Sequence, residues 1–207
     1  MRLTAAEERL IRLFVAAVTG NGEMLVEVRA QAEPGEPDVR WREALLQVHL
    51  FAGFPRTIEA FEVLRRAGGL GSLGPEEMAH EEPAERRIRG EHLFQRIYGE
   101  GAERVGLRMA EHHPELARWI KDHAYGRALV RPGLDERMRE LLAVSALAVS
   151  GPDRQLASHA RGAVRCGAHP DEVFDAVAVV DDLMPSERRA VVQMVLHRFA
   201  VADFDDV

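Results

Sequence analysis

The chain has 207 residues, of which 46% are hydrophobic and 29% charged, and its formal net charge is −7 at pH 7. This composition is typical of a globular protein with a buried core, and it excludes a disordered chain. The acidic balance argues against a nucleic-acid partner, because a phosphate-binding surface needs a surplus of cations.

Helical signals fill the first third of the chain. Thr4 is followed three residues later by Glu7, which predicts a capping box, because each side chain can satisfy a free backbone N–H of the other residue. Leu10, Phe14 and Val18 then recur at helical spacing. Turn-forming glycine and proline residues separate the helices that follow. The helices expected here cover Thr4–Thr19, Glu23–Ala32, Val39–Ala52 and Pro55–Ala67.

Residues 68–82 are rich in glycine, proline and glutamate and are expected to form a linker. Helical patterns resume after them. Pro152, Pro170 and Pro185 each suit the first turn of a further helix, where the missing N–H of proline is not needed. A helix–turn alternation of this kind predicts an all-α helical bundle. The other helices expected in this part cover Glu85–Tyr98, Ala102–Glu111, Pro114–Leu129 and Asp135–Val149.

The two ends of the chain resemble one another. When residues 41–55 are placed over residues 171–185, the apolar positions and the final proline coincide, and Gly20 then meets Gly151. Helices of similar length produce part of such a match by chance, but we interpret it as an internal duplication. The expected division is a degenerate repeat over residues 1–70, a linker with leader helices over 71–129, and a second repeat over 130–207.

Two groups of motifs carry a resemblance to a known family. Residues 131–135 (Arg-Pro-Gly-Leu-Asp), Arg139 and residues 146–148 resemble the opening of carboxymuconolactone decarboxylases, and His159, residues 161–163 and Glu172 continue that pattern. The closing motif of the family is found near the N-terminus instead, at residues 43–47 and 51–55. The resemblance implies the alkylhydroperoxidase D-like fold and a homo-oligomer, since single-unit relatives form dimers, trimers or hexamers.

The swapped order of these motifs predicts one composite site. The counterparts of Glu140, Gln155 and His159 in the first repeat are Arg9, Met24 and Val28, which cannot together transfer a proton. Each repeat therefore keeps the half that the other has lost. We expect the second hairpin of repeat 1 to pack against the first hairpin of repeat 2, so that residues 51–55 lie beside His159.

The candidate catalytic residues are His159 and Glu140. Gln155 and His159 are four residues apart and share one face of a helix, and a short turn folds the helix of Glu140 back beside them. A carboxylate beside an imidazole fixes its tautomer and raises its basicity, which suits a general acid and base near neutral pH. Related alkylhydroperoxidase D-like proteins place a glutamate and a histidine in the same relative positions.

The resemblance implies a lyase or isomerase, most simply a carboxy-lyase, that acts on a small carboxylated or lactone substrate without metal or organic cofactor. Arg139 or Arg161 is expected to hold a substrate carboxylate bidentately. The decarboxylases have glutamate where this chain has Gln155, and because glutamine cannot exchange a proton, this departure weakens the assignment. Further candidate substrate-binding residues are Gln155, His49, Phe51 and Phe54.

Two alternatives remain open. A peroxiredoxin-type alkylhydroperoxidase needs a Cys-x-x-Cys pair, whose positions here hold Pro152 and Gln155; the one cysteine, Cys166, lies out of register. Thiol-based peroxide reduction is therefore disfavoured. A non-catalytic binding or scaffold protein descended from the enzymes is the other alternative. In that case His159 is a satisfied core histidine, Arg139 and Glu140 form a solvated pair, and His49 lies at a subunit contact.

No apolar run approaches the roughly 18 residues that a membrane-spanning helix needs. The N-terminal residues 1–10 carry charges where a signal peptide would have an apolar segment. A cytoplasmic protein without a membrane partner is therefore expected.

Overall fold

The computed structural model describes residues 2–79 and 81–200, and in these residues helices follow one another with no strand between them. The all-α fold class is confirmed. The N-terminal helices are α1 (Ala5–Thr19), α2 (Gly22–Ala30), α3 (Asp38–Gln47), α4 (His49–Arg66) and α5 (Pro75–Met78). The middle ones are α6 (Pro83–Tyr98), the 3-10 turn η1 (Gly99–Gly101), α7 (Ala102–His112), α8 (Pro114–Trp119) and the π-helix η2 (Ile120–Leu129). The C-terminal ones are α9 (Glu136–Ser150), α10 (Asp153–Arg165), α11 (Pro170–Ala178), the 3-10 turn η3 (Asp181–Leu183) and α12 (Ser186–Phe199).

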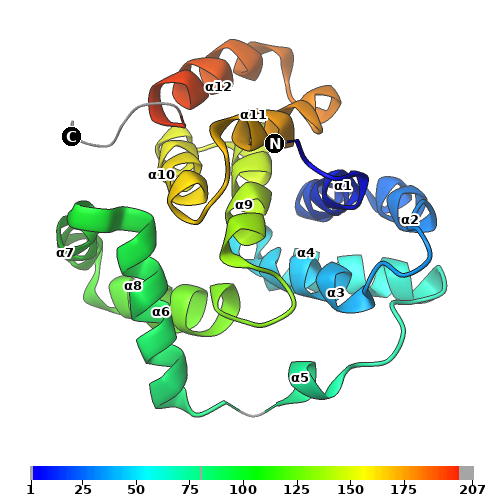
Figure 1. Cartoon of the computed structure of the whole chain (residues 1–207), viewed down its shortest axis with the longest axis horizontal. Coiled ribbons are helices and arrows are strands. Elements are labelled where there is room, and N and C mark those ends of the chain that lie inside the picture. The colour runs from blue at the N-terminus through cyan, green and yellow to red at the C-terminus, as the bar shows by residue number, and fades with distance from the viewer. Residues whose placement is uncertain (1, 80, 201–207) are drawn as a thin grey trace.

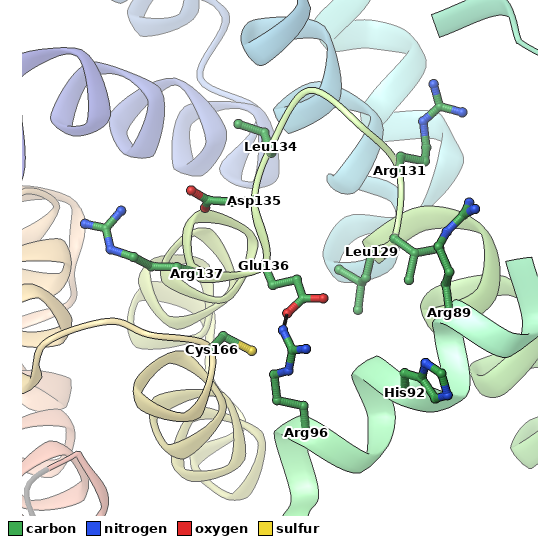
Figure 2. Close-up of a pocket in the computed structure, with 11 residues that line it drawn as sticks. Arg89, His92, Arg96, Leu129, Arg131, Leu134, Asp135, Glu136, Arg137 and Cys166 are labelled. Atoms are coloured by element: carbon green, nitrogen blue, oxygen red, sulfur yellow. Dashed lines mark hydrogen bonds and ion pairs between the residues drawn. The ribbon is translucent and has the colours of Figure 1, made fainter. Parts of the chain in front are cut away.

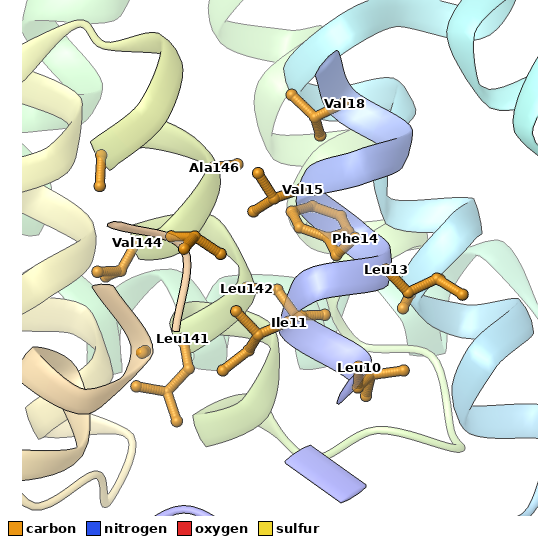
Figure 3. Packing of buried hydrophobic residues seen from close by; sticks show 14 of the residues in the cluster. Leu10, Ile11, Leu13, Phe14, Val15, Val18, Leu141, Leu142, Val144 and Ala146 are labelled. Atoms are coloured by element: carbon orange, nitrogen blue, oxygen red, sulfur yellow. The ribbon is translucent and has the colours of Figure 1, made fainter. Parts of the chain in front are cut away.

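Helices α1 and α9 pack against each other and form the centre of the main core (Figure 1). Figure 3 shows Ile11 and Phe14 of α1 facing the side of α9 that carries Leu142. All three side chains are fully buried. Because burying a large apolar side chain stabilises the fold by about 1.5–3 kcal/mol, this contact is a principal link between the two ends of the chain.

Helices α1–α4 and α9–α12 follow one another in the same order, and in each set the first helix packs against the second and third. This arrangement is compatible with the expected duplication. Similar helix order alone does not distinguish a duplication from convergence, so the repeats and their boundaries stay predictions. Helices α6 to α8 and η2 lie beside the second set (Figure 1).

A close approach of two glycines joins α6 to η2. A Cβ atom built on Gly90 would lie 2.6 Å from the Cα of Gly126, so the backbone of η2 leaves no room for a side chain at residue 90. The contact brings Phe94 edge-on to Tyr125, with ring centroids 4.9 Å apart. A second, smaller core forms around this contact, with Leu93, Ile97 and Leu129 among its buried members.

The structure differs from the sequence-based bounds in several places. The helix expected over residues 39–52 is divided, because α3 ends at Gln47 and α4 begins at His49. The interruption expected at residues 53–55 is a kink, in which Gly53 adopts φ 78° and ψ 168° and α4 continues on both sides. The single helix expected over residues 114–129 is α-helical only to Trp119 and then widens into η2. The linker also contains α5, which is held by paired contacts of 2.6 Å between Glu77 and the Arg42 guanidinium.

Candidate functional site

A hairpin of α9 and α10 brings Glu140 and His159 together. Asp135 caps α9 by accepting a hydrogen bond from the Met138 N–H at 2.7 Å, and Gly151, with φ 55°, turns the chain toward α10. Nδ1 of His159 then lies 2.9 Å from Oε2 of Glu140. The hairpin geometry expected from the sequence is therefore present in the structure.

Gly162 makes room for the carboxylate. A Cβ atom on this residue would lie 2.5 Å from Oε2 of Glu140 and 3.1 Å from Cγ2 of Ile97. Any larger residue would push the carboxylate away from His159 or displace α6. The glycine one turn after His159 thus allows a charged group to lie between three packed helices.

The electrostatics of the pair favour a protonated histidine. Burial by itself lowers the pKa of His159, but the charge of Glu140 and the hydrogen bond to it outweigh burial, and the pKa is raised. A carboxylate only accepts hydrogen bonds, so Nδ1 carries the proton between the two groups. In the described part of the chain no residue hydrogen-bonds to Nε2 of His159. Because Nδ1 is engaged by Glu140, Nε2 is the ring nitrogen that could exchange a proton with a ligand, and the side chain as a whole is 13% exposed.

The N-terminal motif lies beside this pair. The Phe51 ring contacts His159 at a centroid distance of 6.0 Å, and it also approaches Phe14 edge-on at a centroid distance of 5.7 Å. One helix earlier, the Gln47 amide donates to the backbone carbonyl of Arg139 at 2.8 Å. The predicted contact between the first part of residues 51–55 and His159 is confirmed.

Residues 114–193 match the model of the carboxymuconolactone decarboxylase family. This segment belongs to the carboxymuconolactone decarboxylase family. It contains both Glu140 and His159. A protein of Schizosaccharomyces pombe named Peroxisomal protein 2 is 30% identical over 138 residues, which are 65% of this chain and 64% of the relative. The chain thus matches a little under two thirds of that relative's length.

Within this decarboxylase-family segment, Arg139 does not have the role expected from the sequence. Its side chain is buried, and Nη2 donates to Glu43 Oε2 and to the Arg131 carbonyl, both at 2.9 Å. The guanidinium is therefore bound inside the protein and is not available to a substrate carboxylate. The alternative of a solvated pair with Glu140 is also wrong, because both side chains are buried and have different partners.

Arg161 is better placed for an anion than Arg139. It is half-buried, and its guanidinium carbon lies 4.6 Å from the centroid of the Phe199 ring. In the described residues it has no carboxylate partner, and burial followed by the charge of Arg165 lowers its pKa. Gln155, one turn before His159, is exposed to solvent.

His49 and Phe54 form a separate aromatic cluster with His123. The Nε2 atoms of the two histidines are 2.7 Å apart, and the Phe54 ring stacks on His49 with centroids 5.1 Å apart. Phe54 is largely exposed. No contact between His159 and either His49 or Phe54 is found, so of the aromatic candidates only Phe51 touches the histidine. His123 gave no signal in the sequence, because its partner is 74 residues away.

Two tyrosines near Glu140 were also missed from the sequence. The Tyr125 hydroxyl donates to the Tyr98 hydroxyl at 3.0 Å. Burial and the negative charge of Glu140 both raise the pKa of each tyrosine. Both hydroxyls are therefore neutral near pH 7 and can donate hydrogen bonds. Their aromatic character within helical patterns predicts core packing only, and the fold is needed to place them near a carboxylate.

A pocket of about 550 Å³ lies between α6 and the segment that leads into α9 (Figure 2). Neither His159 nor Glu140 lines it. Cys166 does line it, and burial followed by the charge of Glu140 raises the pKa of this thiol to about 12. The thiol is therefore protonated near neutral pH. Thiol-based peroxide reduction requires a thiolate instead, so the state of Cys166 does not suit that reaction.

Among residues 2–79 and 81–200, no three histidine, cysteine, aspartate or glutamate side chains are grouped so that they could hold a metal ion. No helix in this part of the chain is long and apolar enough to cross a membrane.

Proposed function

We propose that the chain is a cofactor-free enzyme that transfers a proton to or from a carbon atom of a small carboxylated or lactone substrate. His159 is the acid and base, and Glu140 positions it. The 2.9 Å contact between Glu140 and Nδ1 of His159 carries this proposal, because it leaves Nε2 as the reactive atom. Family membership of residues 114–193 supports the same reaction class.

In a decarboxylation, the bond between the substrate carbon and its carboxylate breaks, and CO2 leaves. The electron pair moves into the conjugated lactone carbonyl. Nε2–H of the His159 imidazolium then protonates the carbon, and solvent returns a proton to the imidazole. The raised pKa of His159 suits this step, because it keeps the imidazolium populated near neutral pH.

An isomerisation would use the same atom twice. His159 would remove a proton from one carbon as the neutral base and return it to another. We propose Arg161 as the cation that holds a substrate carboxylate, since it is half-buried and carries no carboxylate partner in the described residues. Phe51, which touches His159, would contact an apolar part of the substrate. Gln155, which is exposed, would lie on the solvent side of that substrate.

A non-catalytic binding or scaffold protein is the second candidate. It is favoured by one observation, namely that the 550 Å³ pocket is not lined by His159. A peroxiredoxin-type activity is disfavoured, because Pro152 and Gln155 stand where the family peroxidases have cysteines and the pKa of Cys166 is raised to about 12.

The direct test is turnover of carboxymuconolactone, followed by ultraviolet absorbance. We expect turnover by the wild type, and a loss of about 10²–10⁴-fold in His159→Ala, the usual contribution of a general acid or base. His112→Ala is the matched control, because His112 is exposed at the end of α7. Gln155→Glu, which restores the residue of the decarboxylases, should increase the rate. No turnover by the wild type at high enzyme concentration would end the decarboxylase proposal.

Assembly and location also remain proposals. A homo-oligomer is expected from the family, and light scattering during size-exclusion chromatography would measure it. A peroxisomal location is the alternative to the expected cytoplasmic one, because the name of the Schizosaccharomyces pombe relative assigns that protein to peroxisomes. Fluorescence microscopy of the tagged protein in its own cells would decide between them.

A further inference from the structure

The pocket beside α6 has the size of a ligand site but no role in the proposed reaction. Its volume of about 550 Å³ falls within the roughly 300–1,000 Å³ typical of small-molecule sites. Figure 2 shows its walls, which come from α6, from the segment before α9 and the first turn of α9, and from the end of α10. His159 and Glu140 do not line it, so a ligand here would be bound outside the catalytic pair.

The lining combines an apolar floor with cations. Leu129, Val130 and Leu134 supply apolar surface, and the protonated thiol of Cys166 adds to it. Four arginines and two carboxylates line the pocket, and each of the four arginines is ion-paired with a carboxylate. The arginines are Arg89, Arg96, Arg131 and Arg137, and the carboxylates are Asp135 and Glu136.

Two of the arginines are fixed by the fold. Arg131 donates to Glu43 at 2.8 Å, and that carboxylate is completely buried. Arg137 donates to Glu7 and to Glu172, each at 2.7 Å. These guanidiniums hold helices together, and their charges are already compensated by the carboxylates that they bind. They are not free to turn toward a ligand.

The other two arginines can exchange partners. The Arg89 side chain is 42% exposed and pairs with Glu81 at 2.6 Å. Arg96 is 54% exposed and pairs with Glu136 across the pocket, as the dashed line in Figure 2 shows. Solvent-exposed ion pairs of this kind contribute only about 0–1 kcal/mol, so an incoming anion can replace either carboxylate.

Glu136 already shows which chemical group this pocket accepts. Its carboxylate lies on the Arg96 guanidinium, inside a pocket whose floor is apolar. Since guanidinium groups bind planar carboxylates through two parallel hydrogen bonds, a ligand carboxylate would fit where the Glu136 carboxylate lies. His92, exposed on the same face of α6, provides a further polar group at the rim.

We propose that this pocket binds an amphipathic carboxylate. The carboxylate exchanges with Glu136 on Arg96, with Arg89 beside it, and the apolar tail covers Leu129, Val130 and Leu134. The proposal is independent of catalysis at His159.

Isothermal titration with decanoate, below its micelle concentration and at low salt, tests the site. We expect 1:1 binding by the wild type and about tenfold weaker binding by Arg96→Gln, the effect of losing about 1.4 kcal/mol of charge-assisted contact. Glu136→Gln should tighten binding severalfold, because it removes the competing internal carboxylate. Arg65→Gln is the control, since Arg65 is an exposed, ion-paired arginine on α4 that does not line the pocket. Circular dichroism would check that each variant is folded.

Opposite shifts in the two pocket variants are the signature of the proposal. Equal weakening by Arg96→Gln and Arg65→Gln would overturn it, since that result reports only general charge. Weaker decanoate binding by Glu136→Gln would also overturn the proposal, and so would the absence of binding by the wild type. Equal affinity of the wild type for decanol and for decanoate would overturn it as well. His159→Ala should leave the affinity for decanoate unchanged. Failure of the proposed catalytic function can therefore be distinguished from failure of the proposed binding site.

Discussion

Oε2 of Glu140 lies 2.9 Å from Nδ1 of His159 and links the two helices of the α9–α10 hairpin. The raised pKa of His159 makes this contact a source of pH-dependent stability. Because the folded-state pKa lies above the unfolded value of about 6.5, the contribution is fully present below that pH. It is lost as the pH rises through the folded-state pKa.

Replacing Glu140 with glutamine should lower the pKa of His159. The amide oxygen can still accept the hydrogen bond, but the charge is gone and burial, which lowers the pKa, remains. Titration of the His159 Cε1–H resonance by NMR would measure the shift. In an active enzyme, the basic limb of the pH–rate profile should move to lower pH. Glu59→Gln, an exposed change on α4, is the control, and an unchanged His159 resonance would contradict the assigned cause.

Replacing Gly162 with alanine should both destabilise the protein and separate the pair. The new Cβ would lie 2.5 Å from Oε2 of Glu140, and overpacking of this kind usually costs about 1–3 kcal/mol. Urea unfolding would measure the loss, and NMR would report a lower pKa for His159. Gly106→Ala is the matched control, because its nearest neighbour is the flexible end of Lys121 at 3.7 Å. The control should be neutral or stabilising by up to about 1 kcal/mol.

Replacing Glu43 with alanine should be more damaging than any exposed ion-pair change. The buried Arg139 guanidinium would lose its carboxylate, and breaking a buried pair typically costs about 3–5 kcal/mol. Thermal or urea unfolding would measure it. Glu115→Ala breaks the exposed pair with Arg118 and should change stability by about 0–1 kcal/mol. Similar losses in both variants would show that Glu43 does not hold α3 to α9 through Arg139.

Local patterns predicted the features that depend on neighbours in the chain. Thr4 and Glu7 form the expected capping box, and the turn at Gly151 brings Glu140 to His159 as the hairpin required. Features that depend on distant segments were not predictable. The burial of Arg139 depends on Glu43, 96 residues away, and an arginine beside a glutamate in sequence gives no sign of that partner.

The same limit applies to the pocket and to the tyrosines. The pocket has walls from α6, from the segment before α9 and from the end of α10, and α6 itself packs on η2 through the close approach of Gly90 to Gly126. The contact between Gly90 and Gly126 was not predictable, since a glycine inside a helical pattern by itself indicates only lower helix stability. Tyr98 and Tyr125 meet through this same contact.

The pairing of His49 with His123 predicts a loss of stability in acid. Nδ1 of His49 contacts the Leu46 carbonyl and so carries a proton, which leaves its Nε2 to accept from Nε2–H of His123. Burial, with the charges of His49 and Arg127, lowers the pKa of His123. Since the folded-state pKa lies below the unfolded value of about 6.5, stability is retained above that pH and is lost as the pH falls through the folded-state pKa.

His123→Gln should reduce that acid-side loss, because glutamine can still donate to His49 but does not titrate. Urea unfolding at about pH 7, 6 and 5 would compare this variant with the wild type and with His112→Gln, an exposed control. The Glu140–His159 pair has the opposite pH dependence, since its contribution to stability persists at low pH. In the His123→Gln variant, the pH dependence of the unfolding free energy should therefore follow the Glu140–His159 pair more closely. Parallel pH dependence in all three proteins would show that His123 is not the source of the acid-side loss.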